Sequence, residues 1–134
     1  MRILRRLNGR RAVWALVVLA PLTLPAAHAT EPANSRTVAT DFVHELAAGQ
    51  FAQAEAHFDA QMREHATPAK LQNLWQYIAK KFGPYAKTEG SDSMRYHGKP
   101  MVIVHTMFKQ QTVGLAVFFD QAHQITGLRV VPLQ

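Results

Sequence analysis

Hydrophobic residues in the first half of the chain recur at the spacing of an α-helix. Val38, Phe42 and Leu46 are four residues apart, which places them on one helical face. Asn34, Ser35 and Thr37 offer side-chain oxygens that can cap the first turn. Gly49 follows where a helix commonly ends in a left-handed residue. This pattern predicts a first helix that ends just before Gly49.

Two further helical stretches follow. The first covers residues 51–62, with apolar residues along one side. The second has the clearest start, because Thr67 supplies a capping hydroxyl and Pro68 suits the first helical position. Gly83 ends it. The apolar face of this helix consists of Leu71, Leu74, Trp75, Ile78 and Phe82.

After residue 85 the apolar period falls to two, which is typical of β-strands. The pattern predicts three strands, over residues 101–109, 112–120 and 124–132. It also predicts an irregular or edge strand over residues 85–97. The connections, including a turn at residues 98–100, are short enough to imply antiparallel neighbours. Two to three N-terminal helices followed by three to four strands define the α+β class.

Both faces of the predicted sheet are apolar. Along residues 101–108 and 113–119, the odd-numbered and the even-numbered positions are both mostly hydrophobic. A sheet with helices on one side should have one face in water, so we expect something to cover the second face. That cover is a symmetric partner, a ligand, or the same chain's helices curling around a pocket; we favour a homodimer. The residues expected at this pocket or interface are Met101, Ile103, His105, Met107, Leu115, Val117 and Phe119.

The N-terminus has the three parts of an export signal. A basic segment reaches Arg11, an apolar run follows, and Ala27 and Ala29 occupy the small-residue positions before a cleavage site. The apolar run from Ala12 to Ala27 makes about 24 Å of helix. A hydrocarbon core is about 30 Å thick, which argues against a permanent membrane anchor.

Cleavage after Ala29 would leave a flexible leader over residues 30–35 and a single α+β domain over 36–134. We therefore expect a periplasmic or secreted protein exported by the general secretory route. The Arg10-Arg11 pair makes the twin-arginine route a minor alternative.

The basic charge of the chain lies in the expected signal. The net charge is +6, but the first eleven residues hold five of the 15 lysines and arginines and no acid. The remainder has ten basic residues against nine acidic ones, so a nucleic-acid partner is not expected. The five N-terminal arginines are Arg2, Arg5, Arg6, Arg10 and Arg11.

The residue types argue against several chemistries. The chain has no cysteine, which excludes a thiolate nucleophile, a cysteine-ligated metal and a disulfide. No two histidines have the i, i+4 spacing of a helical metal pair, and neither a metal nor a cofactor is expected. His105, Asp59 and Tyr77 are weak candidates for acid–base catalysis. His105 is singled out because Ile103 and Met107 flank it on its strand face.

The order of core and turn residues resembles a family of exported bacterial domains, domain of unknown function 3887. The matching residues are Phe42-Val43, Leu46, Gly49-Gln50-Phe51, Ala54, Phe58-Asp59, Met62, Pro68, Leu71, Trp75, Gly83, Val117 to Asp120 and Ile125 to Leu128. Such domains are similar to the nuclear-transport-factor-2-like, cystatin-like superfamily. The resemblance implies a cone in which helices pack into a bent antiparallel sheet, and it carries over no functional residue.

Three functions are consistent with these observations. The favoured one is a non-catalytic binding or interaction module. The second is a small pocket enzyme, an isomerase, dehydratase or hydrolase acting on an apolar compound, which needs a cavity holding a carboxylate or His105. The third is an accessory or inhibitory protein of a separately encoded enzyme. The partner is accordingly a second copy, another protein or a small apolar ligand.

Overall fold

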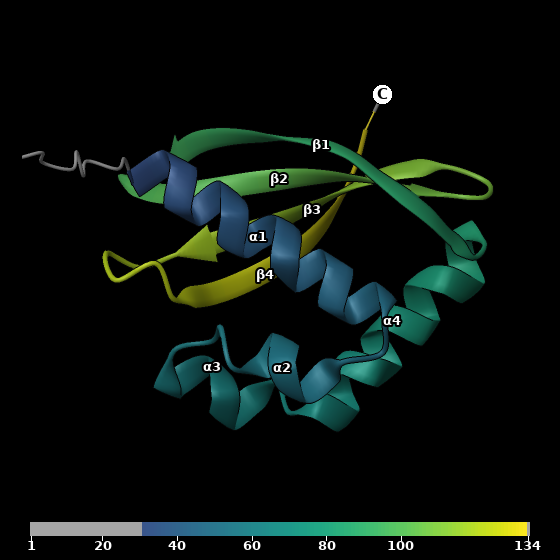
Figure 1. The fold of residues 1–134 in the computed structure, drawn as a ribbon, viewed down its shortest axis with the longest axis horizontal. Helices are drawn as coiled ribbons and strands as arrows, with labels where there is room; N and C mark the ends of the chain where they lie inside the picture. The colour runs from purple at the N-terminus through teal and green to yellow at the C-terminus, as the bar shows by residue number, and fades with distance from the viewer. Residues whose placement is uncertain (1–30, 134) are drawn as a thin grey trace, which may run out of the picture.

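Four helices precede four strands in the computed structural model, which describes residues 31–133, with side chains from Asn34 onward (Figure 1). The elements are α1 (Glu31–Ala47), α2 (Phe51–Glu55), α3 (Ala60–His65), α4 (Pro68–Phe82), β1 (Tyr85–Tyr96), β2 (Lys99–Phe108), β3 (Thr112–Phe119) and β4 (Ile125–Pro132). This order confirms the predicted α+β class. None of the helices within residues 31–133 is long and apolar enough to cross a bilayer.

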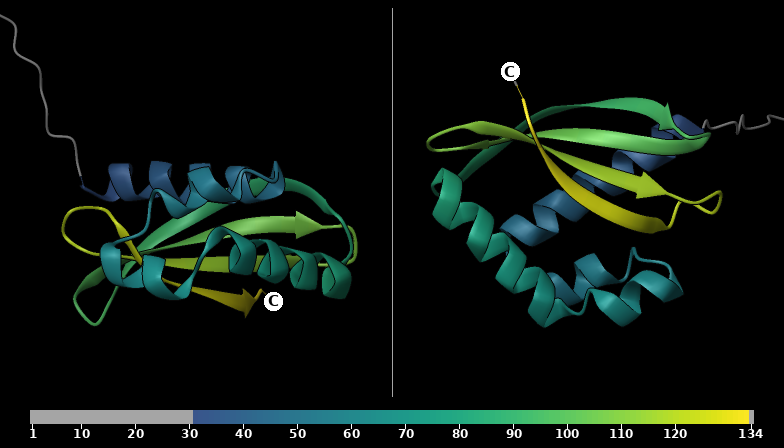
Figure 2. Two further views of the ribbon diagram at one scale, coloured as in Figure 1. Left: turned by 90° about the horizontal axis from the view of Figure 1, so that it is seen from below. Right: turned by 180° about the vertical axis from the view of Figure 1, so that it is seen from behind.

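The strands form one antiparallel meander in the order β1-β2-β3-β4. Alternate residues of β2 and β3 pack against the helices, so the core lies on one side of the sheet. Figure 2 shows α1 running along this side and α2, α3 and α4 grouped below it. The opposite side, which we call the outer face, has no helix over it among the described elements.

α1 ends as the sequence predicts. Gly49 has a φ of +78°, and its N–H donates to the Leu46 carbonyl at 3.1 Å. The Gln50 N–H donates to the Glu45 carbonyl at 2.8 Å, which completes a Schellman motif. The helix begins at Glu31, earlier than the possible caps at 34–37 suggest, so residues expected to form a leader lie in its first turns.

The predicted single helix over residues 51–62 is wrong, because the chain forms two short helices there. The Ile125 N–H donates to the His57 carbonyl at 2.8 Å, and the Asp59 N–H donates to the Ile125 carbonyl at 3.0 Å. This pairing with β4 requires extended backbone between α2 and α3. The Asp59 side chain then restarts the helix by accepting from the Met62 N–H at 2.7 Å.

α4 has the start and end that the sequence predicts. The Thr67 hydroxyl accepts from the Lys70 N–H at 3.3 Å, and Pro68 occupies the first turn. Gly83, with a φ of +92°, ends the helix. A Cβ there would lie 3.0 Å from the Lys109 Cβ, so close contact with the β2–β3 turn also favours glycine.

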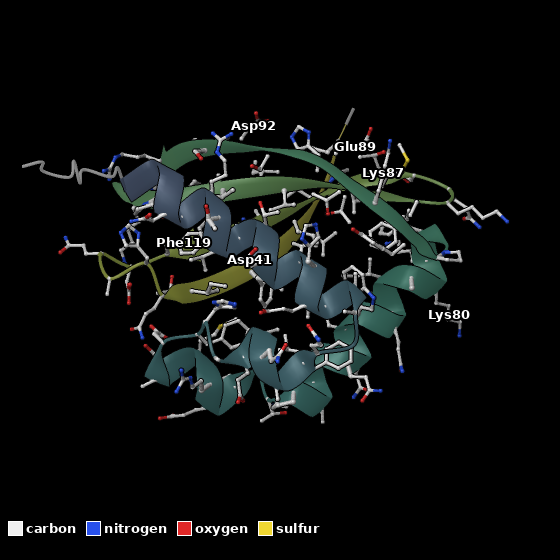
Figure 3. The ribbon with its side chains drawn as sticks, in the orientation of Figure 1. Asp41, Lys80, Lys87, Glu89, Asp92 and Phe119 are labelled. Carbon is white, nitrogen blue, oxygen red and sulfur yellow. The ribbon has the colours of Figure 1, made fainter. Side chains whose placement is uncertain are left out.

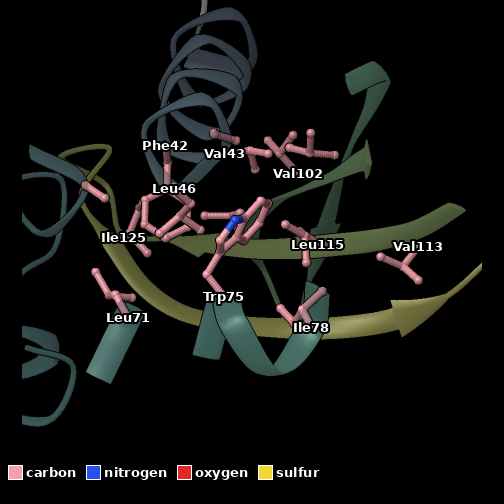
Figure 4. Packing of buried hydrophobic residues seen from close by; sticks show 14 of the residues in the cluster. Phe42, Val43, Leu46, Leu71, Trp75, Ile78, Val102, Val113, Leu115 and Ile125 are labelled. Carbon is pink, nitrogen blue, oxygen red and sulfur yellow. The ribbon is translucent and has the colours of Figure 1, made fainter. Parts of the chain in front are cut away.

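Trp75 of α4 lies at the centre of the core (Figure 4). Its ring centroid is 5.5 Å from that of Phe108 and 5.8 Å from that of Tyr85, which links α4 to β2 and β1. The ring of Phe42, on α1, packs on the ring of Phe58, with 5.6 Å between the ring centroids. The side chains that are almost fully buried include Phe42, Val43, Leu46, Phe58, Ile78, Val102, Val104, Phe108, Val113, Leu115, Val117, Phe119 and Ile125.

The predicted strands are confirmed with small changes at their ends. β1 is an edge strand with two register shifts, which agrees with the irregular strand expected over 85–97. The β1–β2 turn is made by His97 and Gly98, both with positive φ, and not by residues 98–100. A turn with two consecutive residues at positive φ has a backbone twist that matches the twist of the paired strands in a β-hairpin. Pro100 instead lies inside β2, paired with Arg95.

Candidate functional site

The outer face of the sheet carries a row of large apolar side chains toward one end. Met94 pairs with Met101, and Met101 pairs with Phe118, so the three share this face. The centroids of the Tyr96 and Phe118 rings are 5.6 Å apart. The Arg129 guanidinium lies 5.8 Å from the centroid of the Phe118 ring. This surface is open to solvent at Met94, which is 43% exposed, and at Tyr96, which is 45% exposed.

The strand register divides the residues predicted to share one pocket or interface. Met101, Ile103, His105 and Met107 lie on the outer face, where their β3 partners are Phe118, Ala116, Gly114 and Thr112. The other predicted members, Leu115, Val117 and Phe119, are fully buried in the helix-covered core.

These seven residues, expected at one pocket or interface, therefore lie on two opposite faces of the sheet. Val104 pairs with Leu115 and Val102 pairs with Val117, so the second group belongs to the opposite face. Figure 3 shows Phe119 on the helix side of the sheet, near α1.

His105 contacts a carboxylate on the outer face at hydrogen-bond distance. Its Nε2 lies 2.8 Å from the Asp92 Oδ2, and the histidine side chain is 35% exposed. Its register neighbours are Gly90 and Gly114, so no side chain flanks the ring within its row. His105 lines none of the hollows described below. The contact with Asp92 uses Nε2, one of the two ring nitrogens.

The structure keeps the three acid–base candidates apart. Asp59 caps α3, where its carboxylate accepts from the Met62 N–H. Tyr77 lies on the exposed side of α4 and is 62% exposed. His105 lies on the outer face of β2. They belong to three separate surfaces, and no hydrogen bond joins any two of them.

A groove lies between α4 and the last two strands; we call it the α4–sheet groove. Its volume is about 330 Å³, at the lower end of the range of small-molecule sites. Sequence reasoning missed it except for Tyr77, because its two walls come from distant segments. The lining residues are Leu74, Tyr77, Ile78, Lys81 and Phe82 from α4, Gln111 from the β2–β3 turn, and Val113, Val130 and Pro132 from the sheet.

Two polar hollows at the other end of the sheet meet at Lys99 and Asp120, with volumes of about 770 and 490 Å³. Asp120 and Arg95, two of the charged residues that line them, already have structural partners. The Asp120 carboxylate accepts from the Ala122 and Gln124 N–H groups at 2.8 and 2.9 Å, and this stabilises the β3–β4 turn. The Arg95 guanidinium donates to the Gly98 carbonyl at 2.7 Å. These residues therefore shape turns.

Histidines elsewhere also make structural contacts. His57 Nε2 lies 2.9 Å from the Glu45 Oε2, which ties the α2–α3 segment to α1. His123 Nδ1 lies 3.2 Å from the Ser35 hydroxyl, which ties the β3–β4 turn to the start of α1. Within residues 31–133, no three His, Asp or Glu side chains are grouped so that they could hold a metal ion.

The helix-then-meander order and a closely packed core define a small α+β domain. Residues 39–128 match the family described as protein of unknown function, DUF3887, and the chain belongs to this family. The match runs from the middle of α1 into β4, so it includes part of these two elements and all of those between them. No curated protein and no solved structure matches the chain.

Proposed function

We propose that this protein is an exported, non-catalytic interaction domain that pairs with a second copy of itself through the outer face of the sheet. The observation that carries this proposal is the exposure of Met94 and Tyr96 beside Met101 and Phe118. Solvated faces of antiparallel sheets normally carry polar residues. Large apolar side chains open to water on such a face favour a protein partner.

The charges around this surface favour a second copy as the partner. Asp92 and Glu89 supply negative charge along β1, and Lys87 lies beside them (Figure 3). Lys99 and Arg129 supply positive charge on β2 and β4. A twofold axis places the same surface on both subunits, so a face carrying both signs can complement itself.

Export is part of the same proposal. Cleavage after Ala29 would leave Thr30 as the first residue, one position before α1 begins at Glu31. The described helix would thus remain whole in the mature chain, as the first element of a single α+β domain. The α+β order supports placing the domain in the nuclear-transport-factor-2-like, cystatin-like superfamily.

Analytical ultracentrifugation of protein expressed as the full chain tests the interface. We expect a dimer, and we expect Met94→Lys and Tyr96→Lys each to raise its dissociation constant at least about tenfold, equivalent to about 1.4 kcal/mol. Either substitution would bury a lysine in each subunit, and removing its charge from water costs free energy. Two positions are tested because Tyr96 also packs on Phe118.

Tyr77→Lys is the matched control, since Tyr77 is also an exposed tyrosine but lies on α4. It should leave the dissociation constant unchanged. A monomeric parent protein, or equal effects of all three lysine variants, would contradict the proposed interface. Intact-mass measurement of the same material tests export, which predicts a chain beginning at Thr30.

A further inference from the structure

We propose that the α4–sheet groove binds a small amphipathic carboxylate, with its apolar body between α4 and the sheet and its carboxylate at Lys81. This ligand site lies on the helix side of the sheet, away from the outer face. It therefore goes beyond the proposed self-association, and the two are tested separately.

The interior of the groove suits an apolar body. Ile78 and Val113 are almost fully buried and form its deepest part. Leu74 and Phe82 from α4 face Val130 from β4 across it. None of these five side chains carries a hydrogen-bonding group, so a chain or ring lying among them would gain by leaving water.

The rim of the groove suits a carboxylate. Lys81 is the one charged residue among those that line it, and its Nζ lies 5.4 Å from the centroid of the Phe82 ring. Tyr77 and Gln111 add a phenol and an amide, which can donate hydrogen bonds. A cation with two neutral donors and no acid complements an anion and disfavours an ammonium group.

Other occupants fit this combination less well. A wholly apolar ligand would make no use of the three polar groups at the rim. A phosphate or other fully polar anion would leave the apolar interior unused, although most of the lining residues are hydrophobic. An acid with a medium-length hydrocarbon body uses both parts of the groove.

The experiment compares three probes of equal length and different charge, namely octanoate, octanol and octylammonium. Each is titrated into isotopically labelled protein, expressed as the full chain, at physiological salt, and amide shifts are followed by NMR. We expect shifts at residues 74–82 and at Val113 and Val130, with octanoate binding about fivefold more tightly than octanol, as one exposed ion pair allows. Octylammonium should bind most weakly.

Charge reversal at the rim supplies the decisive variant. Lys81→Glu should reverse the order, so that octylammonium binds more tightly than octanoate. Lys80→Glu is the matched control, because Lys80 is an exposed neighbour on α4 that does not line the groove (Figure 3). It should preserve the order found with the parent protein.

Several results would overturn the inference. These are equal binding of the three probes, the same response in the two charge-reversal variants, or shift changes confined to residues outside the groove. Concentration-dependent shifts at Leu74 and Val130 without any probe would show a second copy in the groove, and would overturn it too. Failure of the outer-face dimer would leave this result intact, since Lys81 and Tyr96 lie on different surfaces.

Discussion

The Ile103 side chain packs close to Gly114, its diagonal neighbour on the outer face. A Cβ added to Gly114 would be 2.8 Å from the Ile103 Cγ2 and 2.8 Å from the Val131 Cγ2. Both neighbours are β-branched and have little rotamer freedom with which to move away. The centre of the outer face is therefore closely packed, whereas its end at Met94 and Tyr96 is open.

Gly114→Ala should lower the free energy of unfolding by about 1–3 kcal/mol, because the added methyl group overpacks this contact. Urea unfolding followed by circular dichroism measures the change. Gly127→Ala is the control on the same face, since a Cβ there meets Phe118 at an ordinary 3.5 Å. A Gly114→Ala variant as stable as Gly127→Ala would contradict the packing described.

Leu115→Ala should lower the free energy of unfolding by about 2–5 kcal/mol, because it leaves a cavity in the core. Leu115 is fully buried beneath the helices. The loss relative to the parent protein should be the same at every protein concentration, as expected for a core residue. A loss that vanishes at low concentration would instead place Leu115 at a subunit interface, as the sequence pattern predicted.

Asp59→Ala should lower the free energy of unfolding by about 1 kcal/mol, because α3 loses its N-cap. The effect should be local, with faster amide hydrogen exchange in Ala60–His65 than elsewhere. Asp59→Asn keeps an oxygen that can accept from the Met62 N–H, so it should restore most of the stability. Equal losses in the two variants would show that the cap is not what Asp59 contributes.

Gly49→Ala should lower the free energy of unfolding by about 1 kcal/mol, because the φ of this residue is +78°. No atom lies within 4 Å of an added Cβ, so the loss comes from the backbone conformation alone. Gly49→Asn should cost less, since asparagine tolerates the left-handed region better. Thermal unfolding of both variants measures the difference. A stabilising Gly49→Ala change would contradict the Schellman end of α1.

Local signals predicted much of this fold. The capping hydroxyl of Thr67, Pro68 and the glycines at 49 and 83 act within a few residues of themselves, so α4 and the end of α1 follow from the sequence. The alternation along β2 likewise placed Ile103 and His105 on one face. The α+β class follows from the change of period after residue 85.

Long-range pairing accounts for what the sequence did not predict. The break between α2 and α3 depends on the hydrogen bonds that Ile125 makes with residues 57 and 59, as donor to the first and acceptor from the second, and no local pattern reveals them. Alternation within a strand also says nothing about its register with the next strand, and a shift of one residue exchanges the faces. Leu115 was therefore grouped with Ile103 although it pairs with Val104.

The candidate sites show the same limit. Lys81 and Val130 line one groove although they are far apart in the chain, and neither has an unusual local sequence. Tyr77 was named only as a weak candidate for acid–base catalysis. His105 was predicted from its apolar neighbours to be a partly buried residue, but its partner Asp92 could be recognised only once β1 was placed beside β2.

The link between Ile125 and residues 57 and 59 also affects how the chain can assemble. Each hairpin of the meander can form from neighbouring residues, which keeps most strand pairing local. The α2–α3 segment must wait for β4, the last strand to leave a ribosome or a translocation channel. Until then the apolar side of α1 lacks part of its cover, so chaperone binding and proteolysis compete with folding during this interval.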